Sequence, residues 1–144
     1  MEKRNGCTVI AGCGRLGASI AGKLSEEKKD VMVLDLDKTA FRKLPYFYGG
    51  LTITASATDL EKMTSVDVPN AIVFIAVTDD DCVNICAAQI AKEIFHIPKV
   101  VARIYDEEKI ALVKEMGIDT ICPSELSEKE IANYIQIGGE KRVW

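Results

Sequence analysis

Short apolar runs alternate with longer amphipathic segments along the whole chain. The run at residues 71–77 is apolar throughout, which is typical of a strand buried on both faces of a parallel sheet. In contrast, Leu16, Ile20 and Leu24 recur at the spacing of one face of an amphipathic helix. This alternation predicts an α/β fold, a Rossmann-like doubly wound parallel sheet of about six strands in a single domain.

The same pattern predicts the bounds of these elements. Strands are expected at residues 7–11, 31–35, 51–55, 71–77, 99–104 and 120–122. Helices are expected from the glycine-rich turn after the first strand to the charged stretch 26–29, at 38–44, from 59, at 79–95, at 106–116 and at 127–137. Thr78 is expected to cap the helix that follows it, and Gly117 to end the next one.

The first strand runs directly into the glycine pattern G-x-G-x-x-G and then into a helix. In a dinucleotide-binding turn of this kind, the first glycine, here Gly12, permits the tight turn. The second, Gly14, lets the backbone approach a pyrophosphate, and the third, Gly17, lets the helix pack against the sheet. The free N–H groups at the helix start would then face the phosphates. The turn therefore predicts an adenine-nucleotide site.

An acidic residue, Asp35, ends the second predicted strand, at the place where a dinucleotide site has its ribose ligand. A carboxylate there accepts hydrogen bonds from both ribose hydroxyls and repels a 2′-phosphate. This favours NAD or ADP-type ligands and disfavours NADP. The alternative is a glycine-rich turn followed by an incidental surface Asp.

The composition narrows the expected partners. The 144 residues are 48% hydrophobic, and 18 basic against 22 acidic residues give a formal charge of −4. No basic stretch is interleaved with aromatic residues, so nucleic acid is not an expected partner. The longest apolar run is too short to cross a bilayer, and no signal-peptide core follows the N-terminus. We therefore expect a soluble protein of the cytoplasm.

The five cysteines fit such a compartment, since their number is odd and no C-x-x-C motif is present. A disulfide framework or a zinc site is therefore not expected. Cys82 and Cys86 lie one helical turn apart and either share a soft metal or take part in ordinary helix packing, which we favour. Cys13 is either a redox-sensing thiol or, as we favour, a small residue at a tight turn.

The segment 38–50 is irregular. Pro45 stops a short helix, and three aromatic residues, Tyr46, Phe47 and Tyr48, follow it. These rings either stack on an adenine or belong to a loop that covers the sheet edge, which we favour.

Several motifs together resemble a known family, the N-terminal domain of regulators of potassium conductance (RCK), also called the KTN or TrkA-N domain. The motifs are residues 12–17 (GCGRLG), 34–37 (LDLD), 57–59 (ATD), 76–81 (AVTDDD) with Asn84, 102–106 (ARIYD) and 123–125 (PSE). They stand in the family's order, and the resemblance covers about residues 8–134.

The resemblance implies a cytosolic regulatory subunit that gates a potassium transporter or channel. Such domains bind NAD(H) or ATP/ADP, with AMP as a further candidate, and form homodimers or higher rings. Their partner is a potassium-transporting membrane subunit, so the chain would lie at the inner face of the membrane without spanning it. The whole chain, 1–144, would be one such domain, with a core at 7–137 and a tail at 138–144.

The resemblance also implies roles for individual positions. Arg15 would reach the phosphates, since a guanidinium matches phosphate oxygens, and Arg103 would point to the nucleotide or to the dimer seam. The alternatives are a solvated Arg15 and an ion pair of Arg103 with Asp106. Glu125 matches a position at which some relatives hold a divalent cation, although a helix-capping carboxylate is the role that we favour. The residues expected to bind the nucleotide are Gly12, Cys13, Gly14, Arg15, Leu16, Gly17, Asp35, Leu36, Ser56, Ala57, Val77, Thr78 and Arg103.

Two departures from the family pattern concern ligand choice and size. Where relatives carry Gly-Asp before the Ala-Thr pair, this chain has Ala55 and Ser56, which removes one carboxylate contact to the adenosine. Many relatives also carry a C-terminal ligand-sensing domain, and the sequence does not decide between a single-domain subunit and a fragment.

An enzyme is the alternative from another class, as a small NAD-dependent oxidoreductase; a free-standing redox or nucleotide sensor is a further alternative. Tyr105 and Lys109 match the Y-x-x-x-K of short-chain dehydrogenases, but those enzymes have a differently spaced glycine motif. The single histidine, His96, falls in a loop after a helix, where no partner for general base chemistry is evident. We therefore expect a protein that is not an enzyme.

Overall fold

One parallel sheet organises the part of the chain that the computed structural model describes, residues 4–136. Its strand order is β3-β2-β1-β4-β5-β6, and every neighbouring pair is parallel. The order reverses between β1 and β4, so the two halves of the sheet meet there, as in Rossmann-like folds. The predicted fold class is confirmed.

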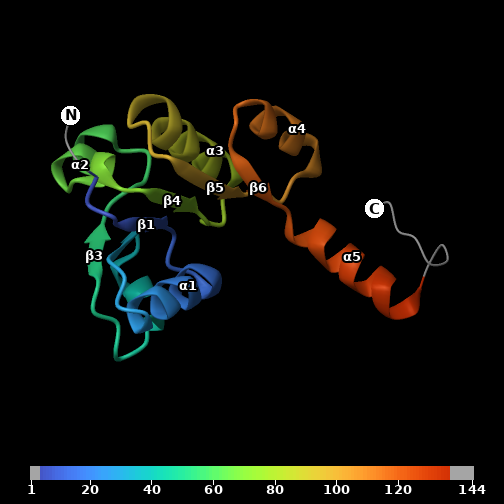
Figure 1. Cartoon of the computed structure of the whole chain (residues 1–144), viewed down its shortest axis with the longest axis horizontal. Helices are drawn as coiled ribbons and strands as arrows, with labels where there is room; N and C mark the ends of the chain where they lie inside the picture. The colour runs from blue at the N-terminus through green and yellow to red at the C-terminus, as the bar shows by residue number, and fades with distance from the viewer. Residues whose placement is uncertain (1–3, 137–144) are drawn as a thin grey trace.

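The elements follow one another along the chain as strand and helix (Figure 1). The strands are β1 (Thr8–Ala11), β2 (Val31–Asp35), β3 (Leu51–Thr54), β4 (Val73–Ala76), β5 (Lys99–Arg103) and β6 (Asp119–Ile121). The α-helices are α1 (Arg15–Glu26), α2 (Leu60–Ser65), α3 (Asp81–Gln89), α4 (Glu107–Glu115) and α5 (Pro123–Ile135). Shorter turns of helix are η1 (Lys38–Lys43) and η2 (Val68–Asn70), both 3₁₀, and the π-type η3 (Ile90–Ile94) that continues α3.

Helices cover the two faces of the sheet unequally. On one face, α2, α3 and α4 pack over all of the inner strands, and Phe74 and Val113 are fully buried between them. On the other face, α1 and η1 cover only β1 and β2, where Ile10 and Val33 are fully buried. Figure 1 shows α1 below the sheet and α2, α3 and α4 above it.

The lower face of β4, β5 and β6 carries no helix of the described chain. Val73, Ile75 and Val101 are partly exposed there, and Ile121 is 38% exposed. Helix α5, which a Rossmann-like sheet would fold back onto this face, instead extends away from the sheet (Figure 1). Two apolar surfaces, this strand face and one side of α5, are therefore left open.

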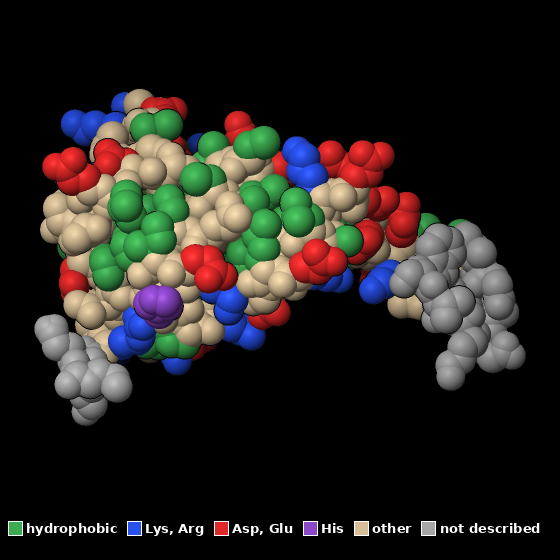
Figure 2. Space-filling view, turned by 90° about the horizontal axis from the view of Figure 1, so that it is seen from above, with side chains coloured by type: hydrophobic (Ala, Val, Ile, Leu, Met, Phe, Trp, Pro, Cys, Tyr) green, Lys and Arg blue, Asp and Glu red, His purple; other side chains and the backbone are tan. Residues whose placement is uncertain are grey.

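Seen from the side of α2, α3 and α4, the surface mixes acidic, basic and hydrophobic side chains (Figure 2). Acidic groups lie between the hydrophobic patches of this face, so it presents no broad basic surface.

Three details of the helices differ from the sequence prediction. Helix α5 begins at Pro123 rather than residue 127, because the fixed φ of proline suits the first helical position. The cap of α3 is Asp80, whose carboxylate accepts from the N–H groups of Cys82 and Val83, and not Thr78. The short helix expected at 38–44 is of the 3₁₀ type and ends at Lys43. The predicted end of the last helix and the predicted tail at 138–144 lie outside the described residues.

The packing of the glycine turn leads to a test of stability. A Cβ at Gly17 would collide with the carbonyl oxygen of Gly12, so Gly17→Ala must push α1 off the sheet. We expect a loss of about 1–3 kcal/mol in the free energy of unfolding, measured by denaturant titration. Gly14→Ser is the control, because nothing lies within 4 Å of a Cβ there and serine suits an N-cap. Equal losses for the two variants would contradict this account of the turn.

Candidate functional site

A cavity of about 460 Å³ opens at the carboxyl ends of the strands, beside the point where the strand order reverses. Ligands of open α/β sheets bind in this position. Many of the predicted residues line it together: Gly12, Cys13, Gly14, Asp35, Leu36, Ser56, Ala57, Val77 and Thr78. The fold thus gathers residues from four separate sequence motifs.

The glycine turn forms one wall of the cavity. Gly12 has a φ of +111°, and a Cβ there would lie 2.8 Å from backbone atoms of Val77 and Thr78. Gly14 differs from Gly12, because its Cβ position is open space. An approaching ligand therefore meets bare backbone at Gly14, as expected of the second glycine of such a turn.

Helix α1 presents its amino end at this turn. Its N-cap is Gly14, which offers no side chain to bond the first N–H groups. The N–H groups of a first helical turn have no acceptor within the helix, and they carry the positive end of the helix dipole. The turn therefore provides unsatisfied donors and positive potential suited to an anion.

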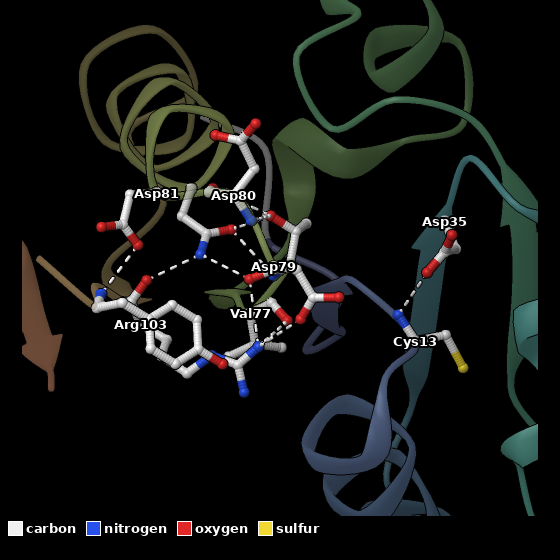
Figure 3. Close-up of polar contacts among 10 residues, drawn as sticks. Cys13, Asp35, Val77, Asp79, Asp80, Asp81 and Arg103 are labelled. Carbon is white, nitrogen blue, oxygen red and sulfur yellow. Dashed lines mark hydrogen bonds and ion pairs between the residues drawn. The ribbon is translucent and has the colours of Figure 1, made fainter. Parts of the chain in front are cut away.

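Asp35 joins the end of β2 to the glycine turn. One carboxylate oxygen accepts from the backbone N–H of Cys13 at 2.8 Å (Figure 3), and the other accepts from the N–H of Asp37 at 2.8 Å. Each carboxylate oxygen has more than one acceptor position. Asp35 can therefore hold the turn in place and still accept a hydrogen bond from a ligand hydroxyl.

The opposite wall, at the end of β4, is held by Arg103 from β5. The Arg103 guanidinium donates to the carbonyls of Val77 at 3.0 Å and Thr78 at 3.2 Å. It also lies 3.6 Å from the carboxylate of Asp79 and stacks over the ring of Tyr105 (Figure 3). Arg103 thus supports the wall from behind and does not line the cavity.

The alternative that pairs Arg103 with Asp106 is wrong. Asp106 instead caps α4 by accepting from the N–H of Glu108, and it lies 3.9 Å from Lys109. Sequence proximity suggested the pair, but the register of β5 directs Arg103 toward the end of β4.

Other predicted residues lie outside the cavity. Leu16 and Gly17 belong to the first turn of α1, and Gly17 is buried against the sheet. Arg15 is exposed and lines a neighbouring groove between α1 and the loop at Pro45 and Phe47.

The cavity also contains residues that sequence reasoning missed. Asp37, Asp79 and Asp80 place three further carboxylates on its wall, and Lys43 is a cation of η1 that lines both the cavity and the groove of Arg15. The acidic residues stood inside recognised motifs and were open to prediction. Lys43 gave no signal, because only the folding of η1 beside α1 brings it there.

These charges define the electrostatics of the cavity. The N–H and hydroxyl of Thr39 bond the Asp37 carboxylate and hold its pKa below its usual value. The carboxylates make their part of the cavity acidic, whereas the glycine turn supplies N–H donors suited to an anion.

The cysteines show different environments. Cys13 is fully buried, and burial together with the nearby Asp35 carboxylate raises the pKa of its thiol, against the opposing effect of Lys43. A raised pKa opposes the thiolate that redox sensing needs. Cys82 and Cys86 are exposed, so the prediction that they take part in helix packing is wrong.

Glu125 is not part of a cluster of metal-binding side chains in the described part of the chain. Glu125 lies in the first turn of α5, and across residues 4–136 no three His, Cys, Asp or Glu side chains gather where they could hold a metal ion. The N-cap of that helix, Cys122, makes no side-chain capping bond.

The aromatic loop does not reach the cavity. Tyr46 is fully exposed, while the Tyr48 hydroxyl donates to the carbonyl of Leu51 at 2.7 Å at the edge of the sheet. Neither residue nor Phe47 lines the cavity, as expected of a loop that covers the sheet edge.

Within residues 4–136, no helix is long and apolar enough to cross a membrane.

The strand order and the glycine turn together define a domain of the Rossmann-like class. Comparison with known proteins identifies its family. The chain belongs to the TrkA-N domain family, whose model matches residues 8–123.

Relatives in the curated proteins are potassium uptake proteins. The chain is 32% identical over 136 residues to the Trk system potassium uptake protein TrkA of Streptomyces coelicolor, covering 94% of this chain and 61% of the relative. It is 28% identical over 128 residues to the TrkA homolog of Methanothermobacter thermautotrophicus, covering 89% and 57%. The chain thus spans about three fifths of the length of these relatives.

Solved structures share the fold. The TrkA-N domain of the inner membrane protein ybaL from Escherichia coli matches with a TM-score of 0.75 at 19% identity, covering 94% of this chain and 97% of that domain. GsuK bound to ADP matches with a TM-score of 0.74 at 20% identity (90% and 34% covered), and the GsuK channel bound to NAD with 0.69 at 15% (84% and 22%).

The environment of Cys13 generates a test with a thiol reagent. We expect iodoacetamide at pH 8 to modify Cys13 at least about tenfold more slowly than Cys82 or Cys86, because burial and a raised pKa keep Cys13 protonated. Peptide mass spectrometry over time measures each rate. The unfolded chain is the control, in which the rates converge. A fast reaction of Cys13 in the folded chain would show that its thiol is accessible and ionised.

Proposed function

We propose that this chain is the nucleotide-binding regulatory domain of a potassium-transport system. The observation that carries the proposal is the open backbone at Gly14, which meets the free amino end of α1 in a cavity that also holds Asp35. The Gly14 backbone and the amino end of α1 suit the phosphates of a nucleotide, and the Asp35 carboxylate suits its ribose. Membership of the TrkA-N family supports a role in potassium uptake.

The proposed ligand is NAD(H) or an adenine nucleotide, ATP, ADP or AMP. The phosphates would lie against Gly12, Gly14 and the first turn of α1, with Arg15 close enough on the surface to approach them. The ribose would bond Asp35, and the carboxylate of Asp37 beside it disfavours the 2′-phosphate of NADP. The NAD and ADP complexes of GsuK are consistent with this ligand class.

The wall formed by Ser56, Ala57, Val77 and Thr78 would enclose the adenosine side. Ser56 is bonded to Thr58, its Oγ lying 2.7 Å from the Thr58 hydroxyl, so its side chain is partly engaged within its own turn. A divalent cation at Glu125 remains a proposal that would need the nucleotide phosphates as its other ligands.

An oxidoreductase finds no support at the cavity. Tyr105 lies under the Arg103 guanidinium, and Lys109 lies 3.9 Å from Asp106. Neither residue lines the cavity, so the Y-x-x-x-K spacing places no proton donor where a ligand would bind.

Regulation of potassium transport would require a second copy of this chain and a membrane partner. Ile131, Tyr134 and Ile135 are exposed on one side of α5, while Ile75 and Val101 are partly exposed on the uncovered face of the sheet. Two copies of the chain that bury these two apolar surfaces against each other would form a dimer with two nucleotide sites. A nucleotide that binds two arrangements of the dimer with different affinity would then pass its state to a potassium-transporting subunit at the cytoplasmic face of the membrane.

Calorimetry tests the ligand class. We expect at least one of NADH, NAD, ATP, ADP and AMP to bind about tenfold or more tightly than NADPH, because the acidic ribose side repels the extra phosphate. Gly14→Val should abolish binding by filling the open position, whereas Gly49→Val, outside the cavity, should leave it unchanged. Absence of binding by every nucleotide would reject the proposed function, and steady oxidation of NADH with a carbonyl substrate would favour the enzyme.

Light scattering after size-exclusion chromatography tests the dimer. We expect the chain to form a dimer at micromolar concentration and Ile131→Asp to shift it to the monomer, because a charge in a buried apolar interface is costly. Leu112→Asp is the matched control, an equally exposed apolar residue on α4. A monomeric wild type, or equal effects of the two variants, would exclude this role of α5.

A further inference from the structure

Asn84 of α3 is a fully buried polar side chain at the switch point, and it does not line the cavity. All of its hydrogen-bonding capacity is used on two strand ends. Its carbonyl oxygen accepts from the N–H of Thr78 at 2.9 Å and from the Thr78 hydroxyl at 2.6 Å. Its amide nitrogen donates to the carbonyls of Thr78 at 3.1 Å and Arg103 at 2.8 Å.

These bonds hold the end of β4 from the side of α3. The N–H and the hydroxyl of Thr78 both donate to Asn84, and the hydroxyl oxygen also accepts from the N–H of Asp80 at 3.2 Å. The carbonyl of Thr78 receives a second donor from the Arg103 guanidinium at 3.2 Å. Thr78 is thus fixed at all three of its polar groups.

The same turn of α3 is also hydrogen-bonded to the backbone that follows β5. The Asp81 carboxylate accepts from the N–H groups of Tyr105 and Asp106, both at 2.9 Å. Figure 3 shows one of these contacts of Asp81 beside those of Arg103. Helix α3, β4 and β5 therefore meet in one polar network, whose centre is Asn84. Every polar atom of the Asn84 side chain has a partner in this network, whereas the buried Nε of Arg103 has none within residues 4–136.

We propose that Asn84 is a positioning residue for the nucleotide. It sets the wall at Val77 and Thr78, and so determines the affinity for a ligand that it never touches. This proposal rests on the proposed nucleotide binding. Because Gly12 packs against the same backbone atoms of Val77 and Thr78, a shift of this wall would also displace the glycine turn.

The chemistry of the amide makes the proposal specific. Aspartate has the shape of asparagine and keeps the acceptor for Thr78, but an ionised carboxylate cannot donate to the two carbonyls. Alanine removes both functions. Each variant removes the side-chain donor of the Arg103 carbonyl and leaves the Thr78 carbonyl with the Arg103 guanidinium alone, which favours a rearrangement of the strand ends.

The experiment compares wild type, Asn84→Asp, Asn84→Ala and the control Val113→Ala by calorimetry with NAD and with ADP. Val113 is fully buried on the same side of the sheet but belongs to α4 and to none of these bonds. All proteins are measured at a temperature at which circular dichroism reports them folded. We expect both Asn84 variants to bind about tenfold or more weakly and the control to match wild type.

A spectroscopic readout separates positioning from general stability. In the nitrogen–proton spectrum, the Thr78 amide proton should exchange slowly with solvent in wild type and in Val113→Ala, and rapidly in Asn84→Ala. Asn84→Ser, which keeps one polar group, replaces the alanine variant if the latter does not fold.

The outcomes distinguish the two proposals. Wild type that binds neither nucleotide rejects the proposed function, and this inference with it. Wild type that binds, together with folded Asn84 variants whose affinity stays within about twofold, leaves the proposed function standing and overturns the positioning role.

Discussion

The contact between the glycine turn and the end of β4 is the constraint on which the site depends. Gly12 lies so close to the backbone of Val77 and Thr78 that any side chain would separate the two central strands' ends. Gly17 packs still more closely on Gly12, which directs α1 so that its amino end faces the cavity. The open backbone at Gly14 and the unpaired N–H groups of α1 follow from these two contacts.

Polar side chains complete the site by fixing strand ends rather than by lining the cavity alone. Asp35 ties β2 to the turn, and Arg103 and Asn84 tie β4 to β5 and α3. The bonds of Asp35 and Arg103 are charge-assisted, and charge-assisted hydrogen bonds are stronger than neutral ones. Of these three side chains, Asp35 lines the cavity, whereas Arg103 and Asn84 shape it without lining it.

The uneven cover of the sheet sets this domain apart from a closed Rossmann-like fold. A helix would be needed to cover the face of β4–β6, but α5 extends away from the sheet (Figure 1). Apolar residues on both surfaces make the arrangement costly in water unless another surface covers them. The proposed dimer is the simplest arrangement that buries both.

The sequence by itself determined the fold class, the approximate positions of the strands and the glycine turn, because apolar periodicity and glycine positions act locally. It also placed Asp35 correctly, since a residue that ends a parallel strand must lie at the carboxyl edge of the sheet. Lys43 in the cavity, the partner of Arg103, the exposure of Cys82 and Cys86, and the direction of α5 were decided only by the tertiary structure. Each of these depends on how distant elements pack, and hydrophobic pattern and local spacing carry no information about that packing.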